Sequence, residues 1–362
     1  MNYALRQQKL TAELKRAGVE ALLVTHLPNI RYLCGFTGSS GALLVHAGEG
    51  GPKSVFCTDG RYIQQAAAEV QCAKLVISKK PALIEACTRA QRAQIKTLGF
   101  EAEHISFNVQ RRLADLLRGS TRLRPVGNLT EALREIKDPE EIEQMKAAAA
   151  LGVGLFRSAL SIIRPGISEA VIAGQLELQA RAAGAEKMSF DTIVAAGPRS
   201  VLPHGRASSQ PVPASGFIIL DYGVILAGYC SDMTRTVHVG RVSGVRRRIY
   251  EAVKEAQMAS IQAVKPGVEA GAVDRAGRQV LKKRGYGAYF THSTGHGVGI
   301  EVHEGPRLAK GQKQKLAPGM VITIEPGVYI PEEGGVRIED MVLVTESGHE
   351  VLTPATKDLI EL

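Results

Sequence analysis

Tryptophan is absent from the sequence, and aromatic residues make up only 5% of its 362 residues. The lack of Trp indicates no function by itself. No apolar stretch approaches the ~20 residues of a membrane span, and residues 1–20 are too polar and charged for a secretory signal. We therefore expect a cytoplasmic protein that does not interact with a membrane.

The sequence also lacks a C-x-x-C motif. Its five cysteines are odd in number and scattered along the chain. This pattern favours buried free thiols in a reducing cytoplasm over a zinc finger or a redox motif. These cysteines are Cys34, Cys57, Cys72, Cys87 and Cys230.

The net charge of +9 is confined to the N-terminal part of the chain. Residues 1–128 hold 18 basic and 9 acidic residues, and the remainder holds 27 of each. The excess follows no basic stripe interleaved with aromatics, so we expect a solvated basic surface and no nucleic-acid partner. A basic rim that steers anionic peptide termini is the alternative.

The length allows two domains, and the pattern suggests where they divide. In the N-terminal third, helix-like segments at 4–17, 81–96 and 109–118 alternate with short β-branched apolar runs at 21–25, 42–46, 54–57, 74–77 and 97–100. This alternation predicts a small α/β domain with a layered sheet. Asp138-Pro139 followed by two acids predicts a helix start. We expect domains at 1–128 and 129–362.

The C-terminal part contains an internal repeat. Residues 163–167 (IRPGI) match residues 264–268 (VKPGV), and each copy continues into a helical stretch ending in Gly184 or Gly285. Each copy then has a histidine near a glycine, His204 or His303, and an apolar strand ending in an acid. Two α/β halves related by pseudo-symmetry predict a site at their interface.

The acids of the two copies form two pairs on predicted hairpins. A turn centred near Leu226-Ala227 would place Asp221 opposite Asp232. Glu325 and Glu339 would pair likewise across a turn at 332–335. The alternative is a set of partly exposed acids, each with its own salt bridge. Two symmetric hairpins with acids at matching positions argue against this alternative.

Buried in apolar strand sequence, four carboxylates repel one another and need a positive partner. Arg235 and Arg337 could contribute, but two divalent cations would do so better. His296, in the glycine-rich stretch 294–299, would add one imidazole to this oxygen-rich site. Such a donor set favours Mn²⁺, Co²⁺, Fe²⁺ or Zn²⁺.

A metal pair ~3.5–4 Å apart lowers the pKa of a bridging water and supplies a hydroxide nucleophile. Histidines near such a pair can donate to the oxyanion or to the substrate. His204, His292 and His303 are the candidates, with a satisfied loop histidine as the alternative for His292.

The C-terminal two-thirds resembles the creatinase/methionine aminopeptidase superfamily of "pita-bread" metallopeptidases. The motifs are LDYG (220–223), SDMTRT (231–236), HSTGHGVG (292–299), VHEGP (302–306), ITIEPGVYI (322–330) and GVRIED (335–340). The resemblance implies five metal ligands, with Glu325 also shuttling protons: Asp221, Asp232, His296, Glu325 and Glu339. It further implies that His204 and His303 steady the intermediate and that His292, Tyr329 and Arg337 surround the substrate.

The N-terminal segments NIRYLCGFTGSSGALLV (29–45) and TDGRY (58–62) resemble the Xaa-Pro branch of that superfamily. The resemblance implies a homodimeric Xaa-Pro aminopeptidase with two divalent ions, most simply Mn²⁺, whose N-terminal domain restricts access. A Xaa-Pro dipeptidase (prolidase) is the nearest alternative. A non-catalytic creatinase-fold binding module is more distant, because no ligand position is lost, and a superfamily lyase on a non-peptide substrate is a further alternative.

Overall fold

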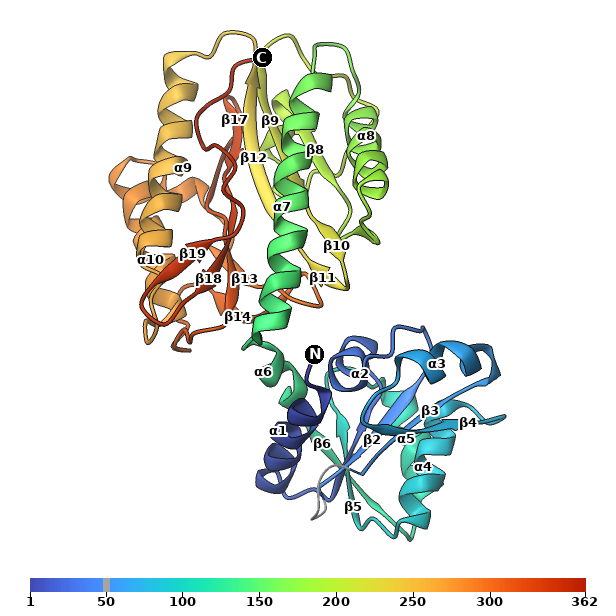
Figure 1. Ribbon diagram of the computed structural model, residues 1–362. Coiled ribbons are helices and arrows are strands. Elements are labelled where there is room, and N and C mark those ends of the chain that lie inside the picture. Colours follow the sequence, from blue (N-terminus) through green and yellow to red (C-terminus); the bar gives the residue numbers. More distant parts are fainter. Residues whose placement is uncertain (48–52) are drawn as a thin grey trace. The chain divides into compact units, whose positions relative to one another are not determined.

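The computed structural model describes residues 1–47 and 53–362, which divide into two compact units, Met1–Arg134 and Glu135–Leu362 (Figure 1). Each unit is described by itself. The domain limits 1–128 and 129–362 stay a prediction.

The N-terminal unit is built on one six-stranded mixed sheet with the order β4-β3-β2-β1-β5-β6. All five expected strands are present, and the register of β1 against β2 pairs Leu22 with Val45. The arginine-rich edge strand β6 was not expected from its polar sequence. The bounds are β1 Ala21–Val24, β2 Ala42–His46, β3 Ser54–Thr58, β4 Ala73–Ile77, β5 Thr97–Glu101 and β6 Arg122–Val126.

Six α-helices accompany this sheet, of which the sequence predicted three. Helices α2, α3 and α6 were missed, and α2 begins after His26 without a side-chain cap of its own. The buried Glu101 carboxylate instead accepts hydrogen bonds from the backbone N–H groups of Thr25 and His26. The bounds are α1 Tyr3–Arg16, α2 Leu27–Cys34, α3 Ile63–Glu69, α4 Ala82–Arg92, α5 Phe107–Leu117 and α6 Leu129–Arg134.

All five cysteines are free, as expected. Four of them are buried, but Cys72 is exposed, so the expectation of burial was wrong for that residue. Cys72 lies in the connection between α3 and β4, where its backbone adopts a positive φ of 56°.

The long helix α7 (Pro139–Ile162) begins where the sequence predicted. Asp138 accepts a hydrogen bond from Glu141 N, and Glu141 returns one to Asp138 N, which completes a capping box. By length and composition alone α7 could cross a membrane, contrary to our expectation. Lys146 and Arg157 interrupt its apolar sequence, and its buried face packs into the core of the unit.

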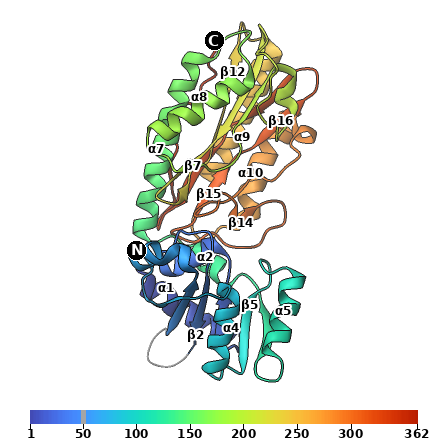
Figure 2. The same ribbon diagram turned by 90° about the vertical axis from the view of Figure 1, so that its right-hand side faces the viewer.

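The C-terminal unit consists of two similar halves, as the repeat predicted. In the first half, α7 and α8 (Glu169–Ala182) accompany a sheet with the order β12-β9-β8, and in the second, α9 (Gly244–Gln262) and α10 (Ala270–Lys283) accompany a sheet with the order β14-β13-β15-β18-β19. Figures 1 and 2 show the paired helices against the strands. Gly184 and Gly285 follow α8 and α10 with φ of 94° and 85°, the left-handed conformation that ends a helix.

The strands of the halves correspond in order. The first half contains β7 Lys187–Met188, β8 Ile193–Ala196, β9 Gly216–Tyr222, β10 Val224–Leu226, β11 Tyr229–Cys230 and β12 Met233–Val239. The second contains β13 Gly295–Gly297, β14 Glu304–Leu308, β15 Val321–Ile324, β16 Gly327–Ile330, β17 Gly334–Arg337, β18 Asp340–Val344 and β19 His349–Val351. Antiparallel pairs β8–β9–β12 thus match β13–β15–β18.

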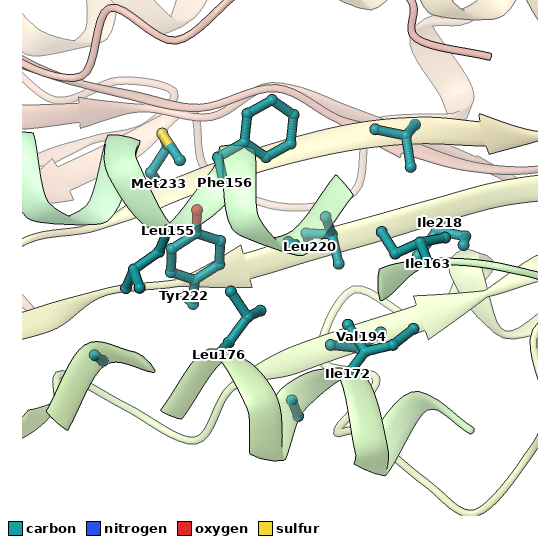
Figure 3. Close-up of a cluster of buried hydrophobic side chains, with 14 of the residues drawn as sticks. Leu155, Phe156, Ile163, Ile172, Leu176, Val194, Ile218, Leu220, Tyr222 and Met233 are labelled. Carbon is teal, nitrogen blue, oxygen red and sulfur yellow. The ribbon is translucent and has the colours of Figure 1, made fainter. Parts of the chain in front are cut away.

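A core of buried side chains holds the first half together (Figure 3). Leu155 and Phe156 of α7 and Leu176 of α8 lie against Leu220 and Tyr222 of β9. These apolar residues alternate along β9 with residues that face the other side of the sheet. Asp221 is therefore turned away from this core, toward the second half.

Candidate metal centre

The first acid pair lies on the hairpin formed by β9–β10 and β11–β12. Its two-residue turn is Ala227-Gly228, because Leu226 pairs with Tyr229 and Ile225 with Cys230. Both turn residues have positive φ, 48° and 77°, as a type I′ turn requires. The turn is one residue later than we expected, and the register changes accordingly.

The pairing partner of Asp221 is Thr234, not Asp232. Our expectation that the two aspartates face each other directly was therefore wrong. Because Asp232 precedes Thr234 by two residues, its side chain still points to the same face as Asp221. The pair is diagonal, and both aspartates are nearly buried, at 8% and 4% exposure.

The second acid pair lies in the hairpin of β15–β16 and β17–β18. Ile324 pairs with Asp340 and Gly327 pairs with Arg337, so the ladders on both sides share one register. Glu325 and Glu339 occupy the step between these ladders and oppose each other. The turn covers residues 331–333, slightly before the expected 332–335.

Hydrogen bonds between the strands join the two hairpins. Thr234 Oγ1 donates a hydrogen bond of 2.7 Å to Glu339 Oε2, and Glu339 N donates to Thr234 O. Arg337 Nη2 donates to Asp221 Oδ2 at 2.6 Å. The four carboxylates are thereby brought to one place.

Only one of the two expected arginines faces these acids. Arg337 is 3% exposed and contacts Asp221 directly. Arg235 points to the opposite side of β12, where it forms an ion pair of 2.7 Å with Asp340. One guanidinium therefore stands beside four carboxylates.

His296 reaches the same place from β13. Its Nε2 lies 3.7 Å from Asp232 Oδ2 and 3.5 Å from Glu325 Oε1. Its Nδ1 bonds to Gly297 O at 2.9 Å, and a proton on Nδ1 leaves Nε2 as a lone-pair donor toward the acids. The flanking glycines are required, since a Cβ at Gly297 would lie 1.8 Å from Gly305 O. Ala195 occupies the matching position of β8, so the first half offers no second imidazole there.

The electrostatics of the site show a deficit of positive charge. Burial raises the pKa of Glu325 to about 7. Burial, together with the neighbouring carboxylates, raises the pKa of both Asp232 and Glu339 well above the ordinary range. Burial also lowers the pKa of His296 to about 4, so this imidazole does not supply the missing charge.

The donor atoms themselves fit metal ions. Asp221 Oδ1 and Asp232 Oδ1 are buried and accept no hydrogen bond. One donor atom from each of Asp232, His296 and Glu339 can be chosen so that the three lie within 4.8 Å of one another. Buried oxygens without partners are rare, and an ion is one of the few explanations for them. The set of four carboxylates and one imidazole suits hard or borderline divalent cations.

A pocket of about 720 Å³ opens onto these residues. Nine of the ten predicted site residues line it: His204, Asp221, Asp232, His292, His296, His303, Glu325, Arg337 and Glu339. Tyr329 does not line the pocket. The Tyr329 hydroxyl instead contacts two residues that do line the pocket, at 2.9 Å from His292 Nε2 and 2.7 Å from Arg337 Nη1.

The histidines take different positions around the pocket. The His303 ring stands edge-on to that of His296, with centroids 4.4 Å apart. His292 is held between Tyr329 and its own loop, and burial lowers its pKa to about 4. His204 lines the wall that the first half contributes.

Several supporting residues escaped the sequence analysis. Thr323 Oγ1 accepts a hydrogen bond from His296 N, and Asp274 of α10 accepts one from Thr294. Arg278 donates to the carbonyls of Phe290 and His292. Thr234 and Thr323 could have been suspected, since each lies two residues from an expected ligand on a strand. Asp274 and Arg278 carried no such signal.

Comparisons with known proteins agree with this geometry. Residues 143–346 match metallopeptidase family M24, and residues 6–136 match the creatinase/prolidase N-terminal domain. An uncharacterized peptidase of Bacillus subtilis, YqhT, is 40% identical over 99% of this chain and 100% of its own.

Two solved structures cover nearly the whole chain. A Xaa-Pro dipeptidase from Bacillus anthracis is 38% identical, with both chains covered completely and a TM-score of 0.96. A Thermotoga maritima X-Pro aminopeptidase is 33% identical, with 97% and 100% coverage and a TM-score of 0.88. These matches confirm the resemblance and the fold class that the motifs predicted.

Proposed function

The chain belongs to metallopeptidase family M24, and from that premise we propose that it is a Xaa-Pro dipeptidase. Its substrates would be dipeptides in which a free N-terminal residue precedes proline. The comparisons favour this alternative over the aminopeptidase that the sequence analysis put first, because the dipeptidase structure is the more similar of the two.

The observation that carries the proposal is the set of buried, unsatisfied carboxylates at the floor of the pocket. The family implies divalent metal ions, and we propose Asp221, Asp232, His296, Glu325 and Glu339 as their ligands. When bound, the ions would supply an activated water and polarise the scissile carbonyl. Mn²⁺ is our first choice for the metal, with Co²⁺, Zn²⁺ or Fe²⁺ as alternatives that the same donors accept.

The protein's own groups have separable tasks in this proposal. Glu325 would accept and return the proton of the attacking water, a role that its carboxylate in the pocket wall allows. His303 and His204 would donate hydrogen bonds to the developing oxyanion from the pocket wall. Arg337 would hold Asp221, whose Oδ2 it contacts, and Tyr329 would hold His292.

The length of the substrate would be set at the pocket wall. A dipeptide presents a carboxylate directly after proline, whereas a longer peptide presents an amide there. Arg206 lines the pocket but is paired with Asp191 at 2.9 Å. Arg307 also lines it with an exposed side chain, and a guanidinium binds carboxylates in bidentate fashion. We assign the dipeptide carboxylate to Arg307.

A product assay on Ala-Pro and Ala-Pro-Ala, with Mn²⁺, Co²⁺ or Zn²⁺ added, tests the proposal. We expect release of alanine from Ala-Pro only. Cleavage of the tripeptide would support the aminopeptidase assignment instead. If neither peptide is cleaved, the Xaa-Pro assignment is contradicted. Arg307→Met should raise the KM for Ala-Pro and leave kcat nearly unchanged, because the contact is uniform to substrate and transition state.

A cytoplasmic location and a homodimer are further proposals that follow from the resemblance. Light scattering on the purified protein tests the dimer, and cell fractionation tests the location.

A further inference from the structure

A buried ion pair lies beside the pocket and is not used in the chemistry above. Lys137 Nζ is 3.1 Å from Glu304 Oε2, and the two side chains are 1% and 7% exposed. Desolvation of both charges offsets much of their attraction, so such a pair seldom adds net stability. Glu304 lines the pocket and directly follows His303. This location suggests a role in the arrangement of the site.

The Glu304 carboxylate organises the loop that returns from β13 to β14. Its Oε1 accepts a hydrogen bond of 3.0 Å from Glu301 N, and its backbone pairs with Gly297. A Cβ at Gly299 would lie 2.6 Å from Oε2, so the carboxylate packs tightly on the loop backbone. The loop 298–303 ends at His303, whose ring contacts that of His296. The direction of the Glu304 side chain therefore affects where the His303 imidazole lies.

Lys137 is itself fixed by the backbone on either side. Its N–H donates to Gly319 O at 2.9 Å, and the next residue, Asp138, is the N-cap of α7. The ammonium group is thus attached to the start of a 24-residue helix packed in the core. It offers Glu304 a rigid partner from a segment 167 residues earlier in the chain.

We propose that Lys137 is a positioning residue that holds His303 in place through Glu304. The proposal rests on the proposed function, in which His303 contacts the reacting group. In the Lys137→Met variant, Glu304 loses its buried partner and turns toward solvent or the pocket. The loop 298–303 then loses its internal support, and His303 is no longer held beside His296.

Hydrogen–deuterium exchange tests the structural step without any activity. In Lys137→Met we expect amides within 299–304 to exchange at least about tenfold faster, with the exchange of β9 and β12 unchanged. Lys146→Met is the matched control, because Lys146 lies on α7 in an exposed pair with Glu350 at 3.0 Å. It should leave the loop as in the wild type. Unchanged loop exchange in Lys137→Met would overturn the proposal.

A double variant guards against a folding defect. Lys137→Met/Glu304→Met removes both buried charges together, so that no buried carboxylate remains after its ammonium partner is removed. We expect its loop amides to remain about tenfold faster than wild type, because the hydrogen bond to Glu301 N is lost. A loop as protected as in the wild type would contradict a positioning role for the pair.

Kinetics on Ala-Pro then test whether the effect passes through His303. We expect Lys137→Met to lower kcat about tenfold with KM and bound metal nearly unchanged. In a His303→Ala background the same substitution should change kcat by less than about twofold, because coupled residues are not additive. If the kcat losses of Lys137→Met and His303→Ala multiply in the double variant, Lys137 does not act through His303. An inactive wild type would refute the proposed function alone, and the exchange experiment would still decide the positioning.

Discussion

Buried or half-buried acids lie beside histidines in both units of the molecule, but they differ in the hydrogen bonds that the protein gives them. In the N-terminal unit, Glu101 accepts hydrogen bonds from Thr25 N, His26 N and Asn29 Nδ2. Glu131 accepts from Asn29 at 2.6 Å and contacts His104 at 2.7 Å. In the C-terminal unit, Asp221 and Asp232 each bury an oxygen that accepts nothing.

The difference separates a structural cluster from a metal centre. Composition alone does not distinguish them, because each combines carboxylates with imidazole. Hydrogen bonds from the protein offset the desolvation of Glu101 and Glu131, so nothing further is needed there. Of the four predicted ligand carboxylates, Asp221 pairs with the Arg337 guanidinium, and in the proposed function divalent cations from solution complete the site.

The most direct way to break this comparison is to remove one pocket acid. Asp232→Asn should lower the hydrolysis of Ala-Pro by more than about 10³-fold, since metal catalysis supplies several kcal/mol of transition-state stabilisation. Activity and bound metal, measured by plasma mass spectrometry, should be lost together. Asp358→Asn, at an exposed pair with Lys254, is the control and should keep both. An Asp232→Asn enzyme with full activity would contradict the metal centre.

The corresponding change in the N-terminal unit should affect stability instead. Glu101→Gln weakens the charge-assisted hydrogen bonds at the start of α2, and we expect the free energy of unfolding to fall by about 2–3 kcal/mol. Urea denaturation measures this change. The bound metal content should remain that of the wild type, and a loss of metal would show that the two clusters are not independent.

Metal-free protein offers a third comparison, in which the expected change in unfolding free energy is smaller. Without ions, Asp232→Asn removes a buried carboxyl whose ionisation is opposed by burial and by the neighbouring carboxylates, and we expect its free energy of unfolding to be about 1–2 kcal/mol higher than that of metal-free wild type. Added Mn²⁺ should then stabilise the wild type and leave the variant unchanged. Urea denaturation in chelator and in Mn²⁺ provides both values. A variant less stable than wild type in chelator would show that the carboxylates are already satisfied.

The smallest expected effect concerns Glu131 and pH. Burial raises its pKa, but hydrogen bonds from Asn29 and His104 outweigh burial and leave the pKa below its usual value. Its contribution to stability is therefore complete above the unfolded pKa of about 4.3 and is lost as pH falls through the lowered folded value. Glu131→Gln should reduce stability by less than about 1 kcal/mol at pH 7, given its partial exposure.

The pH series also contains its own check. The difference in unfolding free energy between wild type and Glu131→Gln should shrink as the pH is lowered below the unfolded pKa. A difference that grows on acidification would contradict the lowered pKa.

Local sequence was sufficient to predict a helix or strand when the interactions that form it lie within the same segment. The helix start at Asp138 and the apolar strands β1, β2, β3, β4 and β5 were predicted because caps and side-chain periodicity act over a few residues. Helix α2 was missed because it has no side-chain cap of its own, and Glu101, about 75 residues away, instead accepts hydrogen bonds from the N–H groups of Thr25 and His26 just before the helix. The turn after β10 was misplaced by one residue because the flanking sequence suits either register, and positive φ at Ala227 was not foreseen.

The sequence by itself determined the acids, the histidines and the duplicated halves, since a repeat and a hydrophobic pattern are properties of order along the chain. Only the tertiary structure decided which partners those residues have. It placed Asp232 diagonally from Asp221, turned Arg235 away toward Asp340, and joined Lys137 to Glu304. Hydrogen bonding and desolvation depend on neighbours in space, so which buried acids have hydrogen-bond partners and which have an oxygen without one is decided only there.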